Sequence, residues 1–307
     1  MTTLLTGHGL VGARVVAQLR GRDEEVVVYD LAPPEPGPGV VPIAGDLLDQ
    51  AALLLAVRRH RPERILHTAG LLTPAGVAQP HDTIRVNVLG TANVLEVARL
   101  EQVPRVVLTS SVVVYDPTVM TDRVTEDHPC APTTVYAATK RSAELLGGSY
   151  ARSFGLSFLT VRFAAVYGPA RRPGGGVSRL IHETLGMAIA DGRASLKRRW
   201  HGRQELLYAE DAASALIAAG FAVAPRHDTF NVGSGQPVTV VELGRAIGAA
   251  AGGAEITVVD PGADANSDVV DAPLDITRAR DELGWRPRFD LRRGLAEHAA
   301  WLRAQRP

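Results

Sequence analysis

The chain has 307 residues, of which 46% are hydrophobic, and its 33 basic residues balance its 33 acidic ones. This length allows one large domain, or a cofactor domain with a smaller partner domain. The balanced charge disfavours binding to nucleic acid or to an acidic membrane surface, and no apolar run approaches the roughly 18 residues of a membrane span. We therefore expect a small-molecule partner, with no nucleic acid and no membrane.

The start of the chain and its cysteine content indicate the compartment. Residues 1–7 lack the basic region and apolar stretch of a secretory signal, so we expect a cytoplasmic protein. Cys130 is the single cysteine and cannot form an internal disulfide. We interpret it as an inert thiol rather than a nucleophile or a ligand, and we predict no metal site.

In chain order, short β-branched runs alternate with longer amphipathic segments through the first two thirds of the chain. This alternation is typical of successive βαβ units and predicts an α/β fold with a doubly wound parallel sheet of the Rossmann type. The expected strands cover residues 3–6, 25–30, 64–68, 105–110 and 157–162, and the expected helices cover residues 10–19, 51–60, 83–100 and 135–153.

Two segments rich in proline and glycine interrupt this alternation. Residues 32–39 form a loop after the second strand, because their prolines remove backbone donors. Residues 171–176 mark the change to a smaller, mostly C-terminal substrate domain, although a later helix and strand are expected to return to the main sheet. We expect a dinucleotide-binding domain of residues 1–168 with 211–232, and a substrate domain of residues 169–210 and 233–307.

A glycine loop lies between the first expected strand and the first expected helix, with the spacing G-x-G-x-x-G. Gly7 permits a tight turn, Gly9 lets the backbone approach a pyrophosphate, and Gly12 lets helix and strand pack closely. The phosphates would face the helix N-terminus. We therefore predict dinucleotide binding by the loop residues Gly7, Gly9, Leu10, Val11 and Gly12.

An acidic residue at the end of the second expected strand indicates which dinucleotide binds. Asp30 lies 23 positions after Gly7, where a carboxylate accepts hydrogen bonds from a ribose 2′-hydroxyl. Because this carboxylate would repel a 2′-phosphate, it favours NAD over NADP. The alternative is a glycine turn followed by an unrelated surface Asp. We expect NAD as the cofactor, in contact with Asp30 and its neighbour Leu31.

Tyr136 and Lys140 are four residues apart in an expected helix, so both lie on one face. A tyrosine with an ordinary pKa of about 10 is a poor base at neutral pH, but a nearby ammonium and a cationic nicotinamide favour the phenolate. The chain has only two lysines, Lys140 and Lys197, so this placement is informative. The alternative is an ordinary surface pair. We predict that Tyr136 and Lys140 transfer protons beside the cofactor.

A serine completes the predicted proton-transfer centre. Ser111 follows a hydrophobic strand, at the edge where such sheets bind ligands. Its hydroxyl can donate to the reacting oxygen of the substrate while Tyr136 exchanges the proton. Ser110 is the competitor, and we interpret it as structural. The predicted catalytic residues are therefore Ser111, Tyr136 and Lys140.

With these residues in place, the chain resembles the extended short-chain dehydrogenase/reductase family, which contains NAD-dependent sugar-nucleotide epimerases and dehydratases. The resemblance covers nearly the whole chain. Besides the glycine loop and the Tyr–Lys pair, it rests on Gly45-Asp-Leu47, His67-Thr-Ala-Gly70, Asn87-Val-Leu-Gly-Thr91, Arg162-Phe-Ala-Ala-Val-Tyr-Gly-Pro169, Tyr208-Ala-Glu-Asp211, Phe230-Asn-Val-Gly-Ser-Gly235 and Leu283-Gly-Trp-Arg-Pro287.

The resemblance implies further contacts and an oligomeric state. Asp46 and Leu47 would border the adenine, and Asn87 would lie near the cofactor. Three residues at the end of the third expected strand and directly after it would line the cofactor, namely Thr68, Ala69 and Gly70. The resemblance also favours Ser111 over Ser110, and it implies a homodimer formed through two helices, with Val94, Val97 and Leu145 as candidate contacts.

Several departures from the family pattern concern the cofactor loop and the substrate. The glycine loop is one residue shorter than the family's, so we expect a tighter pyrophosphate turn. Ala165 replaces an Asn that often contacts the substrate in epimerases. Gln204 replaces an Arg that often grips a diphosphate, although Arg203 is adjacent and is our candidate for substrate binding. Val112 and Val113 stand where dehydratases have Asp and Glu, which disfavours a dehydratase.

The pattern predicts an NAD-dependent oxidoreductase that transfers hydride at a secondary alcohol of a sugar, sugar nucleotide or sugar-like substrate. An epimerase would keep NADH bound and return hydride to the other face, whereas a dehydrogenase would release the oxidised product and NADH. Both outcomes stay open. A different class is a non-catalytic NAD(H)-binding regulatory or scaffold protein, which the intact catalytic residues disfavour. The basic run 197–203 is interpreted as a solvated face, with an anion site as the alternative.

Overall fold

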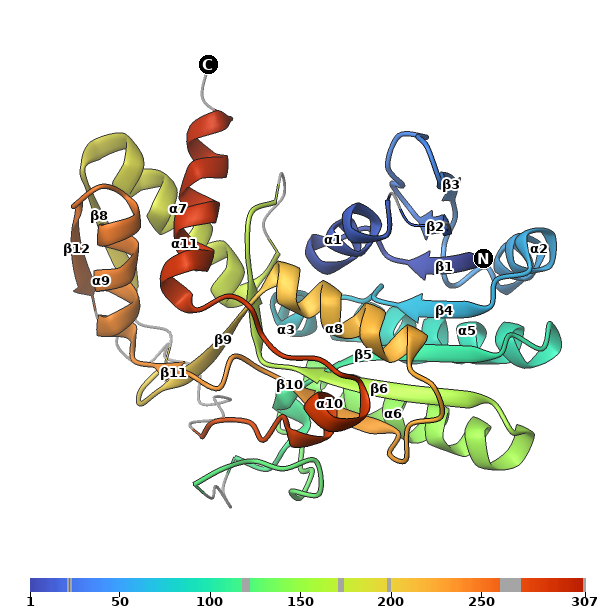
Figure 1. Ribbon diagram of the computed structural model, residues 1–307. Helices are drawn as coiled ribbons and strands as arrows, with labels where there is room; N and C mark the ends of the chain where they lie inside the picture. Colours follow the sequence, from blue (N-terminus) through green and yellow to red (C-terminus); the bar gives the residue numbers. More distant parts are fainter. Residues whose placement is uncertain are drawn as a thin grey trace.

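The computed structural model describes residues 1–20, 22, 24–117, 122–170, 174–197, 200–259 and 272–305. Its centre is a seven-stranded sheet in which all neighbouring strands are parallel (Figure 1). The strands in spatial order are β10 (Thr229–Val232), β6 (Ser157–Phe163), β5 (Arg105–Ser111), β4 (Arg64–His67), β1 (Thr2–Thr6), β2 (Glu25–Asp30) and β3 (Val40–Ala44). The predicted doubly wound parallel sheet is confirmed.

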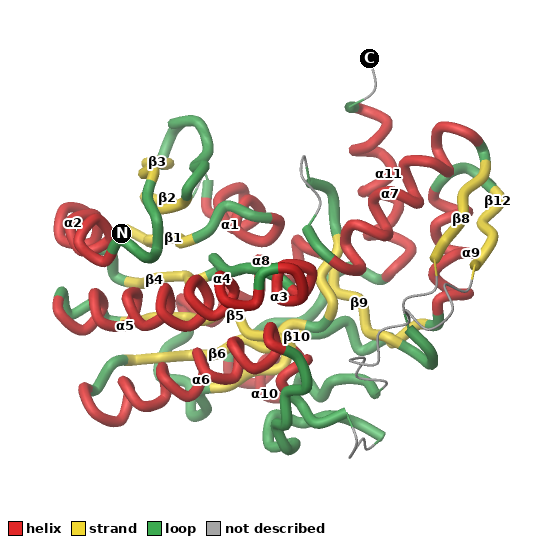
Figure 2. The backbone as a smooth tube through the Cα atoms, turned by 180° about the vertical axis from the view of Figure 1, so that it is seen from behind, coloured by secondary structure: helices red, strands yellow, loops and turns green. Residues whose placement is uncertain are grey.

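Helices cover both faces of this sheet (Figures 1 and 2). One face is covered by α1 (Leu10–Leu19) and α8 (Ala209–Phe221), and the opposite face by α2 (Gln50–His60), α5 (Gly90–Leu100) and α6 (Val135–Phe154). Side chains of each strand alternate between the two cores, since Leu5 packs with the α1 side and Leu4 with the α2 side. This alternation is the pattern that two covered faces require.

The five expected strands are all present, with ends that differ by no more than one residue. The sheet also contains β3, which goes beyond the expectation. Its interior residue Pro42 pairs with Val28 of β2. A proline has no backbone N–H to donate to a neighbouring strand. β3 is an edge strand with a neighbour on one side only, so it tolerates the proline.

The expected helix over residues 83–100 is present, but it begins at Pro80 and contains a π-helical turn that the sequence pattern does not predict. The structure has α4 (Pro80–Ile84), then a π-helical turn η1 (Arg85–Leu89), and only then α5. A π-helical turn adds one residue to the helical circuit, and such turns often occur at functional sites. Here the turn contains Asn87.

The second half of the chain builds two small sheets beside the main one (Figure 1). β9 (Gln204–Tyr208) pairs with β7 (Ala165–Tyr167) in parallel and with β11 (Pro237–Val238) in antiparallel fashion. β8 (Arg193–Lys197) pairs in parallel with β12 (Glu255–Val259). The helices that pack with these strands around a separate core are α7 (Gly176–Asp191), α9 (Val240–Ala250) and α11 (Leu291–Ala304).

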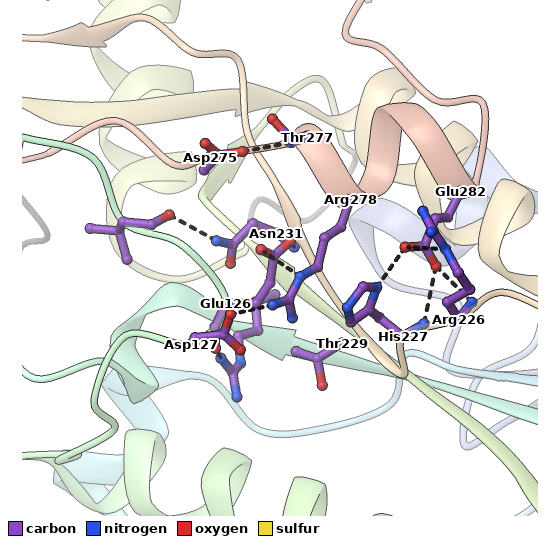
Figure 3. Close-up of polar contacts among 12 residues, drawn as sticks. Glu126, Asp127, Arg226, His227, Thr229, Asn231, Asp275, Thr277, Arg278 and Glu282 are labelled. Carbon is purple, nitrogen blue, oxygen red and sulfur yellow. Dashed lines mark hydrogen bonds and ion pairs between the residues drawn. The ribbon is translucent and has the colours of Figure 1, made fainter.

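The second edge of the main sheet is closed by a side-chain contact. β10 pairs with β6, so the expected return of residues 228–232 to this sheet is present. The backbone N–H of Asn231 donates to Glu126 Oε1 at 2.9 Å, and its side-chain amide donates to the carbonyl of Val124 at 3.0 Å (Figure 3). Arg278 of α10 (Thr277–Glu282) lies 3.5 Å from the Glu126 carboxylate (Figure 3).

Candidate active site

The glycine loop joins β1 to α1 and has no room for side chains at two of its three glycines. Gly7 has φ +93°, and a Cβ on it would lie 2.6 Å from the backbone nitrogen of Ala69. A Cβ on Gly12 would lie 2.0 Å from the carbonyl oxygen of Gly7, whereas a Cβ on Gly9 would meet no atom within 4 Å. The tight turn and the close helix–strand packing therefore require Gly7 and Gly12, and Gly9 faces open space.

The open side of this loop suits a pyrophosphate. Gly9 is the N-cap of α1, and the first turn of α1 contains no acidic residue. The first backbone N–H groups of a helix have no partner within the helix and attract anions. The backbone from Gly9 to Gly12 is thus a cradle in which an added Cβ at Gly9 would occupy the space that a phosphate needs.

Asp30 ends β2 directly beside this cradle. Its Oδ2 accepts the backbone N–H of His8 at 2.7 Å, and its Oδ1 accepts the backbone N–H of Ala32 at 2.8 Å. Each carboxylate oxygen keeps further acceptor capacity for a ribose hydroxyl. The next residue, Leu31, has 75% of its surface exposed. A flat ligand could cover this apolar side chain.

The segment after β3 packs against Tyr29 of β2. The Tyr29 hydroxyl donates to the carbonyl of Asp46 at 3.0 Å, and a Cβ on Gly45 would lie 2.2 Å from the Tyr29 ring. Leu47 is 7% exposed, and its carbonyl accepts from the Asn93 amide at 2.8 Å. Asp46 and Leu47 therefore lie one strand beyond Asp30, on the side where the resemblance places the adenine.

The segment after β4 connects the cofactor cradle to the lysine. Thr68 Oγ1 donates to the carbonyls of Thr6 and Gly7 at 2.9 and 2.8 Å. Two positions further on, a Cβ on Gly70 would lie 3.0 Å from Asn87 Oδ1 and 3.5 Å from Lys140 Nζ. The backbone from Thr68 to Gly70 thus runs from the glycine loop to the ammonium group.

Asn87 in the π-helical turn holds this segment in place. Its Oδ1 accepts the N–H of Leu71 at 2.7 Å, and its Nδ2 donates to the carbonyl of Leu71 at 2.9 Å. Nδ2 also donates to Thr139 Oγ1 of α6 at 3.0 Å. The Asn87 amide is thus buried between the segment after β4 and helix α6.

The predicted proton-transfer residues meet at the carboxyl edge of the sheet. Tyr136 and Lys140 are buried on α6, with the Lys140 nitrogen 5.9 Å from the centre of the Tyr136 ring. Lys140 donates to the carbonyl of Thr109 on β5 at 3.0 Å. Ser111 at the end of β5 lies close enough to the Tyr136 hydroxyl to lower the pKa of that phenol. The neighbouring Ser110 instead donates to a carboxylate inside the protein at 2.6 Å, as strand alternation requires.

Burial controls the acidity of both groups. Burial raises the pKa of Tyr136 to about 12, while the nearby Ser111 side chain opposes the rise. Burial lowers the pKa of Lys140 to about 8, and the charge of Glu144 opposes that fall. Tyr136 therefore needs more positive charge nearby before it becomes a base at neutral pH, which is the condition that a cationic nicotinamide would supply.

The structure does not bring Arg203 to this centre. Its guanidinium donates to the carbonyl of Pro237 at 3.0 and 2.8 Å and lies 3.4 Å from the Glu242 carboxylate. Within the same basic run, Lys197, His201 and Arg203 are exposed, as expected of a solvated face, whereas Trp200 is 1% exposed and belongs to the small core. Residues 198 and 199 lie outside the described residues.

No pattern in the sequence predicts the cavity that lies beside Tyr136. It has a volume of about 340 Å³ and is lined by Thr73, Gly76, Val77, Pro80, Thr134, Val135 and Tyr136. α3 (Thr73–Ala78) forms one wall, since a Cβ on Gly76 would lie 3.3 Å from Tyr136 Cβ. None of the described lining residues is charged, so the cavity is suited to uncharged groups.

Comparison with known proteins agrees with this site. Residues 3–233 match the model of the NAD dependent epimerase/dehydratase family. The chain is 30% identical to UDP-glucose 4-epimerase of Mycolicibacterium smegmatis, over 99% of both proteins. It is 28% identical to the mitochondrial L-threonine 3-dehydrogenase of Bos taurus, over 94% of this chain and 79% of that protein.

Solved structures of similar proteins have the same fold over the full length. UDP-glucose 4-epimerase of Thermus thermophilus in complex with NAD is 28% identical, covers 100% of both chains and gives a TM-score of 0.86. L-threonine dehydrogenase of Phytophthora infestans is 26% identical, also covers 100% of both chains and gives 0.89. These relatives are enzymes, which supports the catalytic interpretation and not the regulatory one.

None of the described helices is long and apolar enough to cross a membrane. The cytoplasmic location stays a prediction. The match of the family model, the full-length relatives and the geometry of the cradle agree on NAD as cofactor. The chain therefore belongs to the NAD-dependent epimerase/dehydratase family and is an NAD-dependent oxidoreductase of the extended short-chain dehydrogenase/reductase type.

Proposed function

We propose that this enzyme is a dehydrogenase that oxidises a secondary hydroxyl of a small, sugar-like substrate, with Ser111, Tyr136 and Lys140 as its proton-transfer centre. The observation that carries the proposal is the buried Tyr136 phenol, which lies beside Lys140 and close to Ser111, at the sheet edge that also bears the glycine loop. An acid–base group and a hydride acceptor must both reach one carbon atom, and this edge offers both.

In the proposed oxidation, Tyr136 as phenolate takes the proton of the substrate hydroxyl. The C–H bond of the same carbon breaks with its electron pair, and the carbonyl forms. NAD supplies the hydride acceptor. Ser111 donates a hydrogen bond to the reacting oxygen, and the ammonium of Lys140 favours the phenolate. The reverse sequence reduces the ketone, with Tyr136 returning the proton.

The cofactor would be held along the carboxyl edge of β1, β2 and β4. The geometry supports the glycine loop for the pyrophosphate, Asp30 for the ribose hydroxyls and the Gly70 segment for the nicotinamide half. The proposed NAD-binding residues are Gly7, Gly9, Leu10, Val11, Gly12, Asp30, Leu31, Asp46, Leu47, Thr68, Ala69, Gly70, Asn87, Tyr136 and Lys140.

The side chains of the small sheets support an uncharged substrate. Gln204 is neutral where the family often has an arginine for a diphosphate, and its buried side-chain oxygen has no hydrogen-bond partner among the described residues. The guanidinium of Arg203 is bonded to Pro237 and Glu242. A neutral amide with unused hydrogen-bonding capacity matches a substrate hydroxyl better than a diphosphate.

The start of α7 supports the same substrate class. Ser178 in its first turn is 4% exposed, and its hydroxyl has no partner within the described part of the chain. A Cβ on Gly174 would lie 3.6 Å from Leu72 and 3.9 Å from Ser178, so this turn lies over the segment that follows Gly70. Buried polar groups normally have partners, and a substrate hydroxyl would satisfy this one.

A nucleotide-sugar 4-epimerase is the second candidate, because a UDP-glucose 4-epimerase matches at 30% identity over 99% of both proteins. Under that candidate Arg203 would have to leave Pro237 and bind the substrate. The two candidates differ in whether NADH accumulates.

The experiment uses the purified protein with added NAD and two panels of substrates. One panel contains free hexoses and pentoses, and the other contains UDP-glucose, dTDP-glucose and UDP-glucuronic acid. We expect NADH absorbance to rise with a member of the first panel, and Tyr136→Phe to abolish the rise. A new epimer from the second panel without accumulation of NADH would contradict the proposal and favour the epimerase.

We also propose a homodimer. Val94 and Val97 are 0% exposed and belong to the core, so they do not serve a contact between subunits. Leu145 on α6 is 56% exposed, and Ile84 and Leu89 on the adjoining helical segments are 49% and 50% exposed. Light scattering should give the dimer mass, and Leu145→Glu should lower it. A monomeric native protein would overturn the proposal.

The division of the chain into two domains is a further proposal, with the boundaries 1–168 with 211–232, and 169–210 with 233–307. The packing of α8 and the pairing of β10 support the first domain. β7 lies within the first range but pairs with β9 of the second, so the chain crosses between the domains at β7.

A further inference from the structure

A buried carboxylate that the proposed mechanism does not use lies one turn beyond Lys140 on α6. Glu144 is 7% exposed. Its carboxylate accepts hydrogen bonds from Arg162 Nε and Nη2 at 2.9 and 2.8 Å, from Ser110 Oγ at 2.6 Å and from Arg141 Nη1 at 2.8 Å. Burying a carboxylate is costly unless such partners surround it. Four donors from three elements therefore meet at one point beside the proton-transfer centre.

These bonds connect the elements that carry the catalytic residues. Ser110 is the residue before Ser111 on β5, Arg162 is on β6, and Glu144 shares one face of α6 with Tyr136 and Lys140. The Glu144 carboxylate thus joins the end of β5 to α6. Tyr136 and Lys140 of the same helix must lie close to that end of β5. Small displacements between such groups lower catalytic rates strongly.

Arg162 is also held from its far side. Its Nη1 donates to the carbonyl of Glu126 at 3.1 Å. The side chain of Glu126 is itself bound to the backbone of Asn231 and lies close to Arg278 (Figure 3). Arg162 is 3% exposed, so it has no access to bulk water as a substitute partner. Glu144 is therefore the carboxylate that compensates the buried positive charge of Arg162.

Glu144 also acts on the charge of Lys140. Burial lowers the pKa of Lys140 to about 8, and the negative charge of Glu144 raises it. The other groups that face Lys140 are the Tyr136 ring, the Asn87 amide, the Thr109 carbonyl and His67. Burial lowers the pKa of His67 to about 3, so this imidazole is neutral and adds no charge near pH 7.

We infer that Glu144 is a positioning residue of this enzyme: it ties the Lys140 turn of α6 to β5 and β6, and it keeps Lys140 in the ammonium form. The inference rests on the proposed role of Tyr136 and Lys140. Arg141 and Arg162 neutralise part of the Glu144 charge, so the ammonium depends on the balance among these three side chains.

The small number of lysines allows a direct test without substrate or cofactor. Because the chain has two lysines, spectra of protein with isotope-labelled lysine contain two side-chain signals, and Lys140→Met identifies which is which. The pH titration of the Lys140 signal is expected to have its midpoint near pH 8. In Glu144→Gln we expect the midpoint to fall by about one pH unit, a tenfold gain in acidity, because an opposite charge is lost and two arginines are exposed to Lys140.

A matched control exists at the other end of the sheet. Glu24 is also 7% exposed, accepts from Arg64 Nη1 at 2.6 Å and is bound by the hydroxyl of Thr3, near the amino ends of β1 and β4. Glu24→Gln should lower thermal stability as Glu144→Gln does, but it should leave the Lys140 midpoint unchanged. Glu144→Asp, which restores the charge, should return the midpoint toward the native value.

If Glu144→Gln does not fold, the variant Arg141→Gln tests whether Glu144 acts on the titration of Lys140. Arg141 is partly exposed, with 32% of its side-chain surface accessible. Removing its charge in Arg141→Gln leaves Glu144 less neutralised, so the Lys140 midpoint should rise by roughly half a pH unit. Arg99→Gln is the control, because Arg99 forms the same i,i+3 pair with Glu96 at 2.7 Å and is 34% exposed.

An unchanged Lys140 midpoint in Glu144→Gln, or in Arg141→Gln where the first variant fails to fold, would overturn the inference. This outcome is separate from a failure of the proposed function. Full activity in Tyr136→Phe would remove the proposed catalytic role while the Lys140 titration stayed responsive to Glu144. Conversely, an inert midpoint with inactive Tyr136→Phe would remove only the positioning role.

Discussion

The carboxyl edge of the main sheet and the small sheets beside it differ in how their polar groups are satisfied. At the sheet edge, Asn87, Lys140 and Thr68 are all bonded within the protein. On the small-domain side, Gln204 Oε1 and Ser178 Oγ are buried without a partner among the described residues. Since buried polar atoms normally have partners, the groups at the sheet edge are organised by the protein itself, and the proposed substrate would supply partners for the two groups on the small-domain side.

The largest expected effect tests the organised side. Tyr136→Phe removes the hydroxyl that exchanges the proton, so kcat should fall by about 10²- to 10⁴-fold. NADH binding, followed by fluorescence titration, should stay within twofold because the ring and Lys140 remain. A variant that kept native kcat would show that Tyr136 is not the acid–base group.

The second effect compares two glycines of one loop. In Gly12→Ala the new methyl group lies 2.0 Å from the Gly7 carbonyl, so thermal unfolding should show a loss of about 1–3 kcal/mol and NADH binding should be lost. Gly9→Ala meets no atom within 4 Å, so its stability should be native while its NADH affinity falls. Native NADH affinity in Gly9→Ala would place the pyrophosphate elsewhere.

A moderate effect is expected at the ribose. Asp30→Asn removes the charge that accepts ribose hydroxyls, and hydrogen bonds to charged groups contribute about 1.5–3 kcal/mol. The affinity for NADH should therefore fall at least tenfold, and the preference over NADPH should shrink because the repulsion of the 2′-phosphate is gone. Titration of both dinucleotides measures this. Equal affinities of the native protein for both would contradict the assigned role.

The smallest effect is expected at the two buried polar groups of the small-domain side, Ser178 and Gln204. Ser178→Ala and Gln204→Ala each remove one hydrogen-bonding group, so KM for the substrate should rise about two- to tenfold at unchanged NADH affinity. Neither variant should be less stable on account of lost hydrogen bonds, because the serine hydroxyl and the glutamine oxygen have no partner within the parts of the chain that the structure describes. An unchanged KM in both would place the substrate away from these residues.

Local patterns in the sequence predict the organised side well. Tyr136 and Lys140 follow helical spacing, the glycine loop follows a strand, and Asp30 ends the next strand, so each needs only its own element to be placed. Ser111 could be chosen over Ser110 by resemblance, and strand alternation explains the difference physically. These residues stand where the sequence places them, and their functional roles stay proposals.

The rest depends on tertiary contacts that no short pattern contains. β3 is stable despite Pro42 because it is an edge strand. The π-helical turn at Asn87 is explained by bonds to Leu71 and Thr139 from two other elements. Glu144 has no distinctive neighbours in the sequence, and its partner Arg162 lies on another strand.

The two edges of the main sheet also bear on how the protein behaves at high concentration. Exposed strand edges pair with other chains and cause aggregation. On the outer strand β3, Pro42 offers no N–H for such pairing. On the outer strand β10, the N–H of Asn231 is already bound to Glu126. Glu126→Ala would expose the N–H of Asn231, so we expect this variant to self-associate through β10. The native Glu126 side chain prevents this association.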